Sequence, residues 1–591
     1  MPEPGQGERQ GITRQDVSPF SYAVVPDVSI PTATALSLPW QTGTEVLPQP
    51  FMEDRSMEIG IEEPGFFETQ SFEPQASPDP DVEAAIIEQP LDKPLGTFCL
   101  LGESGEADPH LLKHSSSLSH TENFEYRRVY RDRNLANGVD GLDYQRPLIF
   151  MTSSSIINKH CEPRVEEDDL KKIGIELDRI DSKVAVRLVK LYFKYIYPYF
   201  PVISRSRMLQ DYGLAENTVS DLPLSLKAAL YACALPFMVY DDVLSTMLDT
   251  NLPNAKTLTR MCWIAITHEV HSPRLSTMQA CLLLLQRDKV DRNEHLSPFQ
   301  SSLMAWTVSL AQSLGFTTDC STVRSIPAWE KRLRKRTWWA TYTLDKWMFS
   351  LAGLPSHIRV DDFDVLPLQS EDFESDGKGS TILSPDTTTE STHFQLLVEV
   401  TLILADIIDA FYTIRASKAT AGDFAKTCRL ANDFNSRLEE WKLVFGQFTD
   451  AQRPVPIPRT RMDGGASLHI AYWAVRLMIF RAQLRSLSAA SGTFEDKELR
   501  ELRRDSVRHE AESCCVSPSN FALASSVMMR LLVTSTSPIE KSRLHELIER
   551  WRWVLRSGGG NVGGNLTSLA LLRLDRSLVD GNRDADASTT N

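Results

Sequence analysis

Residues 328–367 read AWEKRLRKRTWWATYTLDKWMFSLAGLPSHIRVDDFDVLP, and this stretch decides the fold class. Its first part places apolar side chains at helical spacing, which predicts one long amphipathic helix with a face available for burial. We expect Gly353 to end this helix, because glycine readily adopts the left-handed conformation at a helix C-terminus. The side chains expected to be buried are Leu333, Trp338, Trp339, Tyr342, Leu344 and Met348.

The same helical spacing recurs over most of the chain, whereas alternating strand patterns are scarce. No internal repeat of fixed period is present, so a solenoid is not favoured. We therefore predict an all-α fold with one large multi-helix domain. Further helices are expected at residues 181–197, 258–272, 276–289, 297–315, 393–414, 422–446, 467–488, 519–533 and 538–556.

Composition divides the chain into segments. Residues 1–95 are rich in Pro, Ser, Thr and acidic side chains and lack periodicity, so we expect a disordered acidic tail. Residues 96–165 are expected to be a partly ordered lead-in with turns and one short helix. The helical domain is expected over residues 166–575, with a disordered loop at about 369–392. A polar disordered tail is expected at residues 576–591.

The charge of the 591-residue chain is concentrated at one end. Residues 1–110 hold 20 acidic and 4 basic side chains of the total 78 and 63, which leaves 58 acidic and 59 basic in the rest. The main body is therefore neutral and offers no general surface for polyanions. The sequence has no run of 18 apolar residues and no secretory signal pattern, so we expect no membrane partner. Its nine cysteines are expected to be reduced thiols.

The acidic tail contains EEPGFFETQSFEP at residues 62–74, in which Phe66, Phe67 and Phe72 alternate with glutamates. Aromatic side chains among carboxylates are typical of acidic activation segments, because the charges keep the rings in water until an apolar groove binds them. An ordinary acidic linker has a similar composition and remains the alternative.

A search for catalytic or metal-binding patterns gives little. HEVH at residues 268–271 has histidines at i and i+3, whereas a zinc-protease helix needs i and i+4. LGESG at 101–105 does not satisfy the nucleophile-elbow pattern, and GGGNVG at 558–563 follows a helix instead of a strand. No C-x-x-C pattern occurs. We therefore expect no enzyme, and the sequence indicates no catalytic residue, metal ligand or cofactor-binding residue.

The basic run at Arg332, Arg334, Lys335 and Arg336 has two interpretations. It is compatible with a nuclear-localisation signal. It is also compatible with arginines that pair with acids such as Glu330 or the later aspartates. Because the run lies on an amphipathic helix, pairing is the favoured interpretation.

Three motifs in order resemble the middle homology region of the fungal-specific transcription factors that carry a binuclear zinc cluster. The first is LVKLYFKYIYPYFPVISRSRML at residues 188–209, and the second is AQSLGF at 311–316. The third lies within residues 328–367, and it also contains Ile358. We call the residues that fill its pattern the signature residues. They are Glu330, Arg332, Arg334, Arg336, Trp338, Trp339, Asp345, Gly353, Pro355, Asp361, Asp364 and Pro367.

The sequence around residues 98–166 is similar to the lead-in of a subgroup near the nitrogen-utilisation co-activators. It contains FCLLGESGEADPHLL at 98–112, YRRV at 126–129, PLIFM at 147–151 and CEPRVE at 161–166.

One family feature has no counterpart in these residues. The family's cluster uses six cysteines at C-x₂-C-x₆-C spacing to hold two zinc ions, but the first cysteine here is Cys99 and no such spacing occurs. Zinc and direct DNA binding are thus implied by the resemblance without ligands or DNA-contacting residues to assign. We expect either that an upstream exon encodes the cluster or that the protein reaches promoters through a DNA-bound partner.

The resemblance implies a nuclear regulator of RNA polymerase II transcription whose helical domain responds to an effector. Its expected partners are the transcription machinery or a DNA-bound factor, together with a small-molecule effector. A co-activator without DNA contact is one alternative, and a cytoplasmic helical scaffold or ligand-sensing protein is another. Trp338, Trp339 and Tyr342 are candidates to line an effector pocket, although plain core packing is the favoured role.

Overall fold

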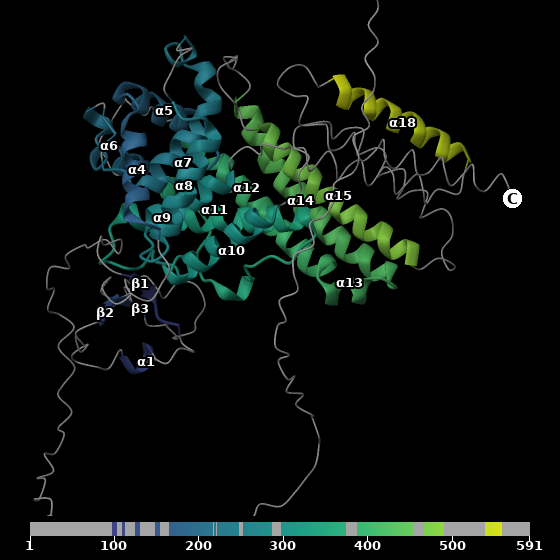
Figure 1. Ribbon diagram of the computed structural model, residues 1–591. Helices are drawn as coiled ribbons and strands as arrows, with labels where there is room; N and C mark the ends of the chain where they lie inside the picture. The colour runs from purple at the N-terminus through teal and green to yellow at the C-terminus, as the bar shows by residue number, and fades with distance from the viewer. Residues whose placement is uncertain are drawn as a thin grey trace, which may run out of the picture. The chain divides into compact units, whose positions relative to one another are not determined.

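The computed structural model describes the helical body and a small sheet (Figure 1). The described residues are 97–102, 109–112, 124–129, 148–153, 165–216, 218–219, 221–246, 252–286, 297–373, 387–452, 465–489 and 538–557. The predicted acidic tail, including Phe66, Phe67 and Phe72, lies outside them. So do the predicted helix at 519–533 and the predicted tail at 576–591.

Helices make up most of the described chain, which confirms the predicted all-α class (Figure 1). Those of the first part are α4 (Glu167–Asp178), α5 (Ser182–Tyr195), α6 (Arg205–Gln210), α7 (Leu224–Ala234), α8 (Ala255–Glu269), α9 (Leu275–Gln286), α10 (Pro298–Ser313) and α11 (Ala328–Ala352). Those of the second part are α12 (Thr387–Ile407), α13 (Ile414–Thr420), α14 (Phe424–Gln452), α15 (Gly465–Ala489) and α18 (Pro538–Ser557).

Short helical turns join several of these helices. The 3₁₀ turns are η1 (Leu214–Glu216), η2 (Leu235–Tyr240), η3 (Leu244–Thr246), η4 (Val360–Asp362) and η5 (Ser370–Phe373), and a π-helical turn, η7 (Ile408–Tyr412), follows α12. Both η5 and the first turn of α12 lie inside the predicted disordered loop at 369–392, so the ends of that segment are helical.

The helix ends follow local side-chain chemistry. Ser297 accepts a hydrogen bond from the backbone N–H of Gln300, and the Gln300 side chain accepts one from the backbone N–H of Ser297, which forms a capping box at α10. Asp181 and Asn254 cap α5 and α8 in the simpler way, through one side-chain oxygen each. Gly353 follows α11 in the left-handed conformation, with φ of 71°, as expected from the sequence.

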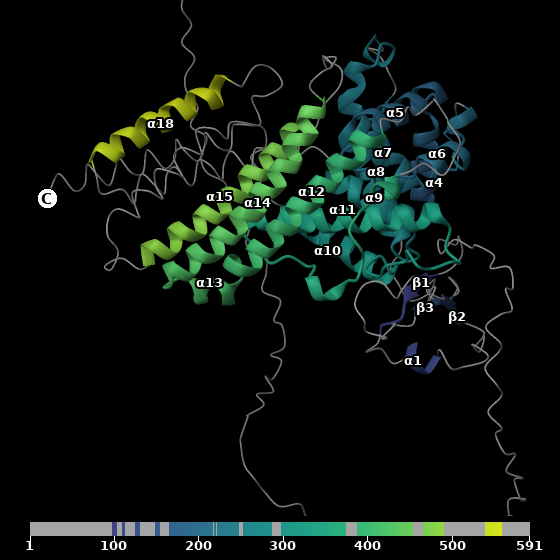
Figure 2. The same cartoon turned by 180° about the vertical axis from the view of Figure 1, so that it is seen from behind.

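Two apolar cores hold the helices together. In the first, α9 is the central element, since every side chain from Leu275 to Leu285 is buried against neighbouring helices. In the second, Trp441, Tyr472 and Ile548 of α14, α15 and α18 pack together. Both views show α14 beside α15, with α12 next to them (Figure 2).

Helix α12 belongs to both cores. Its residues Phe394 and Val398 pack in the first core, whereas Val400 and Leu404 pack in the second. It therefore contributes buried residues to both cores and joins them directly. None of the described helices combines the length and the apolar character needed to cross a bilayer.

A three-stranded antiparallel sheet precedes the helices, in a region where we expected only turns and a short helix. It consists of β1 (Thr97–Leu100), β2 (Phe124–Val129) and β3 (Leu148–Ser153), in the order β1-β3-β2. The expected short helix, α1 (Pro109–Leu112), is present. The strands have only four to six residues and pair with partners distant in sequence, so local periodicity gave little signal for them.

The sheet packs on the turn between α10 and α11. Leu148 and Phe150 of β3 form a small core with Cys320, Val323 and Ile326. Gly315, at the end of α10, has φ of +72°, and a Cβ atom there would lie 2.8 Å from Cε1 of Phe150. A glycine is thus required at this position both by its conformation and by the closeness of the sheet.

We predict that Gly315→Ala destabilises the protein by about 3 kcal/mol, because it combines left-handed strain with overlap on Phe150. Gly353→Ala is the matched control. Gly353 has φ of +71°, but a Cβ atom added to it would meet no neighbouring atom within 4 Å, so we expect a loss of only about 1 kcal/mol. Urea unfolding of both variants measures the difference, and equal losses would exclude a structural role for the sheet contact.

Candidate functional site: the signature residues around α11

The first half of α11 carries buried arginines with specific partners. Arg334 Nε lies 2.8 Å from Oε1 of Glu330, and both side chains are buried. Arg334 also donates to the carbonyl oxygen of Leu314 at 2.8 Å, and its guanidinium lies over the ring of Phe316. The predicted pairing of Arg334 with Glu330 is therefore confirmed, and the pair fastens α11 to the end of α10.

Arg336 connects α11 to two further segments. Its Nε donates to the carbonyl oxygen of Pro201 at 2.9 Å, and its Nη1 donates to the carbonyl oxygen of Asp372. Lys335 Nζ lies 2.8 Å from Oδ2 of Asp372. Burial lowers the pKa of Arg336, with the nearby charges of Arg332 and Arg205 acting in the same direction. Arg336 thus uses backbone carbonyl groups where we expected a carboxylate, and it joins the 188–209 motif to the loop after α11.

The tryptophans of α11 are core residues. Trp338 and Trp339 are 1% and 2% exposed. The ring of Phe363 lies 5.1 to 5.8 Å from the rings of Trp338, Trp339 and Tyr342, measured between centroids. Trp339 Nε1 also donates to the carbonyl oxygen of Leu366 at 3.0 Å. These contacts hold the loop that contains Asp361, Asp362 and Asp364, which we call the Asp-rich loop, against α11.

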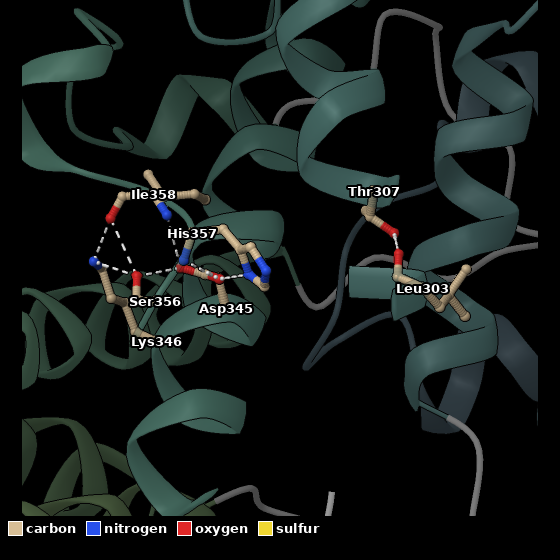
Figure 3. Close-up of polar contacts among 7 residues, drawn as sticks. All are labelled: Leu303, Thr307, Asp345, Lys346, Ser356, His357 and Ile358. Carbon is tan, nitrogen blue, oxygen red and sulfur yellow. Dashed lines mark hydrogen bonds and ion pairs between the residues drawn. The ribbon is translucent and has the colours of Figure 1, made fainter. Parts of the chain in front are cut away.

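Asp345 organises the turn after α11 (Figure 3). This fully buried carboxylate accepts hydrogen bonds from Ser356 Oγ, from the backbone N–H of His357 at 3.0 Å and from that of Ile358 at 3.2 Å. Nδ1 of His357 lies 3.1 Å from its Oδ1. One aspartate therefore fixes three consecutive residues, and its carboxylate serves as the hydrogen-bond acceptor on which this turn is built.

Lys346 completes the same network (Figure 3). Its Nζ donates to Ser356 Oγ at 2.7 Å and to the carbonyl oxygen of Ile358 at 2.6 Å. Burial lowers the pKa of Lys346, whereas the negative charge of Asp345 acts to raise it. Lys346, Ser356 and His357 were not among the residues predicted from the sequence, because only their positions in space relate them to Asp345.

Asp364 links the Asp-rich loop to the residues after α10. Its Oδ1 accepts from the backbone N–H of Asp319 at 2.6 Å, and its own backbone N–H donates to the carbonyl oxygen of Thr317 at 3.1 Å. Asp361 belongs to the same loop, and both aspartates are exposed. Asp364 therefore connects the third motif to residues that directly follow the motif at 311–316.

The other signature residues are spread between surface and core. Arg332 is half-buried on α11, Ile358 is buried, and Gly353, Pro355 and Pro367 are exposed in the loop. Within the described ranges, no group of three or more His, Cys, Asp or Glu side chains is placed to hold a metal ion. In this arrangement, side-chain atoms of α11 form hydrogen bonds with backbone groups of three loops and so hold those loops in place.

Comparison with known proteins shows what this helical region is similar to. The family described as the fungal specific transcription factor domain matches residues 189–443. Residues 189–443 are thus similar to the fungal specific transcription factor domain. The match covers the motifs at 311–316 and 328–367 and nearly all of the motif at 188–209, and it confirms the resemblance seen in the sequence.

Relatives with this similarity are named as transcription regulators. An uncharacterized transcriptional regulatory protein of Schizosaccharomyces pombe is 30% identical over 312 residues, 52% of this chain and 42% of the relative. The transcriptional activator protein DAL81 of Saccharomyces cerevisiae is 24% identical over 443 residues, 65% of this chain and 43% of the relative.

The nitrogen assimilation transcription factor nit-4 of Neurospora crassa is 24% identical over 331 residues, 53% of this chain and 28% of the relative. The chain thus spans less than half the length of each of these three relatives. The matched family and the names of these relatives describe transcription regulators and not enzymes. No solved structure matches the chain.

A buried acid lies in the first core of the fungal transcription factor domain, within the HEVH sequence. Oε2 of Glu269 accepts hydrogen bonds from Ser225 Oγ at 2.7 Å and Thr277 Oγ1 at 2.9 Å. Burial raises the pKa of Glu269, although these hydroxyl groups act to lower it. The carboxyl group therefore joins α7, α8 and α9, a role that the sequence pattern did not indicate.

We predict that Asp345→Ala destabilises the domain by about 3 kcal/mol, because it removes the acceptor of three loop donors and leaves Lys346 buried beside no carboxylate. Chemical unfolding of the purified protein measures the loss. Asp361→Ala, in the exposed part of the same loop, is the control and should change stability by less than about 0.5 kcal/mol. Similar losses in the two variants would contradict the role assigned to Asp345.

We predict that Glu269 makes the domain less stable as pH rises. Its pKa in the folded protein is above the ordinary value of 4.5, so the folded state holds this proton more tightly than the unfolded state does. The contribution of Glu269 to the free energy of unfolding is greatest below pH 4.5. It falls as pH rises through the raised pKa of the folded state. Glu269→Gln should remove this contribution and leave the variant relatively more stable at neutral pH.

Unfolding free energies measured across this pH interval test the expectation for Glu269. Glu371→Gln, at an exposed position in η5, is the control and should retain the wild-type pH profile. A Glu269→Gln profile that parallels the wild type would show that Glu269 does not titrate differently in the folded protein.

Proposed function

We propose that the chain is a nuclear regulator of RNA polymerase II transcription. In this proposal residues 166–575 are the regulatory domain, and residues 1–95 contain an activation segment centred on Phe66, Phe67 and Phe72. The observation that carries the proposal is the match of residues 189–443 to the fungal specific transcription factor domain, inside which Arg336, Asp345 and Asp364 each bind groups of neighbouring segments. The transcription factors and activators among its relatives support it.

We propose a regulatory role for the domain because α11 is bonded to several neighbouring segments. Arg334 and Arg336 fix its first half to α10 and to the loop at Pro201, and Trp347 Nε1 donates to Thr401 of α12 at 2.9 Å. A ligand that prefers one packing of α11 would thereby also change the packing of α12. We propose that a small-molecule effector acts on the domain in this way.

Contact with promoter DNA is assigned in this proposal to a DNA-bound partner factor. The balance of 59 basic and 58 acidic side chains after residue 110 gives the body no broad positive surface for phosphate groups. The acidic residues of the tail would be repelled by DNA but are compatible with binding to components of the transcription machinery.

The test is a fusion of the full chain to a heterologous DNA-binding domain, measured with a reporter gene. We predict activation by the fusion and a reduction to about the reporter background when Phe66, Phe67 and Phe72 are all changed to alanine, since the acidic segment then lacks aromatic anchors. The matched control changes Phe20, Tyr22 and Trp40 to alanine, three tail aromatics outside residues 62–74, and should keep activity. A silent wild-type fusion would refute the activation segment.

Localisation separates the proposal from its main rival. The tagged full chain should lie in the nucleus and be recovered at promoters by chromatin immunoprecipitation. Exclusion from the nucleus, with no chromatin signal, would instead favour a cytoplasmic scaffold.

A further inference from the structure

Helix α10 has an outward face without charge. Its sixteen residues, Pro298–Ser313, contain no acidic or basic side chain. Leu303 and Thr307 face the interior, and Thr307 Oγ1 donates to the carbonyl oxygen of Leu303 at 2.7 Å (Figure 3). The exposed positions are Pro298, Ser302, Trp306, Ser309 and Gln312. A helix with one face in water normally carries charged side chains there, so this surface differs from an ordinary solvated one.

Trp306 lies in a cluster of aromatic side chains on this surface. Its ring stacks on that of Trp263 of α8, with centroids 5.4 Å apart and an angle of 29° between the planes. Trp263 in turn meets Phe299 edge-on, with centroids 4.9 Å apart. We call Trp263, Phe299 and Trp306 the aromatic patch. Trp306 remains 39% exposed although its ring stacks on Trp263, which leaves apolar ring surface available for binding.

The exposed lysine and arginine of α8 lie on the same helix face as Trp263. Lys256 and Arg260 are exposed on α8, two turns and one turn before Trp263, so the three share one face of the helix. The carboxylate of α8, Glu269, is largely buried and bound by Ser225 and Thr277. Among the described residues of α8 and α10, the exposed face thus combines an uncharged aromatic centre with a basic edge.

We propose that the aromatic patch binds a segment of a partner protein in which acidic side chains flank an aromatic or aliphatic one. Protein interfaces are depleted of charge at their centres and enriched in tryptophan, and tryptophan is frequent among the residues that contribute most to binding. The basic edge selects an acidic partner by complementarity. This inference goes beyond the proposed function, because it concerns a binding surface that purified protein should display without any transcriptional assay.

The same charges argue against other occupants of the patch. A second copy of the chain, docked patch to patch, would bring two pairs of cations together. Among the described residues of α8 and α10, a nucleic acid would find only Lys256 and Arg260 for its phosphates, whereas such complexes depend on many phosphate contacts. A purely apolar partner would leave the basic edge unused.

The test uses the purified full chain and a fluorescein-labelled synthetic peptide of about 14 residues, composed of Glu and Asp around one Phe and two Leu. Fluorescence anisotropy should give saturable binding that weakens as salt is added. Trp306→Ala should weaken binding by about tenfold or more. The double variant Lys256→Glu and Arg260→Glu should also weaken it and should remove most of the salt dependence.

Two control variants match these changes in chemistry and exposure. Trp553, which is 70% exposed on α18, is changed to alanine as a control for Trp306, and the exposed Arg415 is changed to glutamate as a control for charge. Both should bind the peptide as the wild type does. Thermal unfolding verifies that each variant is folded, and the charge variants keep the test decisive if Trp306→Ala is unstable.

Several results would overturn the proposal. They are an absence of saturable binding, an equal loss in Trp553→Ala, or equal affinity for a peptide in which every acid is replaced by lysine. Self-association in sedimentation experiments that Trp306→Ala abolishes would assign the patch to a second copy of the chain. Tighter binding of a single-stranded oligonucleotide than of the acidic peptide would assign it to nucleic acid.

Discussion

The structure depends on the burial of five charged side chains on a single helix. Glu330, Arg334, Arg336, Asp345 and Lys346 all lie in α11 and are all buried. A buried charge destabilises a protein unless it has a close partner, so each of these groups fixes the position of whatever satisfies it. Most of these partners are backbone groups near residues 201, 314, 356–358 and 372. The path of the chain around α11 is therefore dictated by the charges of α11 itself.

This constraint explains why the recognisable sequence pattern is so long. Arg334, Arg336, Asp345 and Asp364 satisfy backbone groups of other segments. Trp338, Trp339 and Tyr342 hold the loop containing Phe363 by packing. The pattern is thus foremost a description of how a fungal specific transcription factor domain is assembled. Loss of activity after substitution of Arg336 or Asp345 consequently needs a measurement of folding before it is read as a loss of regulation.

The sequence allowed the parts governed by local periodicity to be predicted, and it failed where partners are distant. The helices and the Glu330–Arg334 pair follow from spacings of three and four residues. The pairing of β3 with β1 and β2 does not, since its register involves residues separated by long connections. The carbonyl partners of Arg336 and the hydroxyl partners of Glu269 were missed for the same reason. No pattern in α10 identified Trp306, because its significance depends on Trp263 of another helix.

The position of α12 in both cores limits how the protein can be divided. Its Phe394 face and its Leu404 face are each buried against a different set of helices. A fragment that ends before α12 would leave the first core open, and one that begins after it would open the second. We therefore expect the described helices to unfold in one cooperative transition. A truncated form of this protein therefore reports on the whole body only if it keeps α12 together with both of its neighbours.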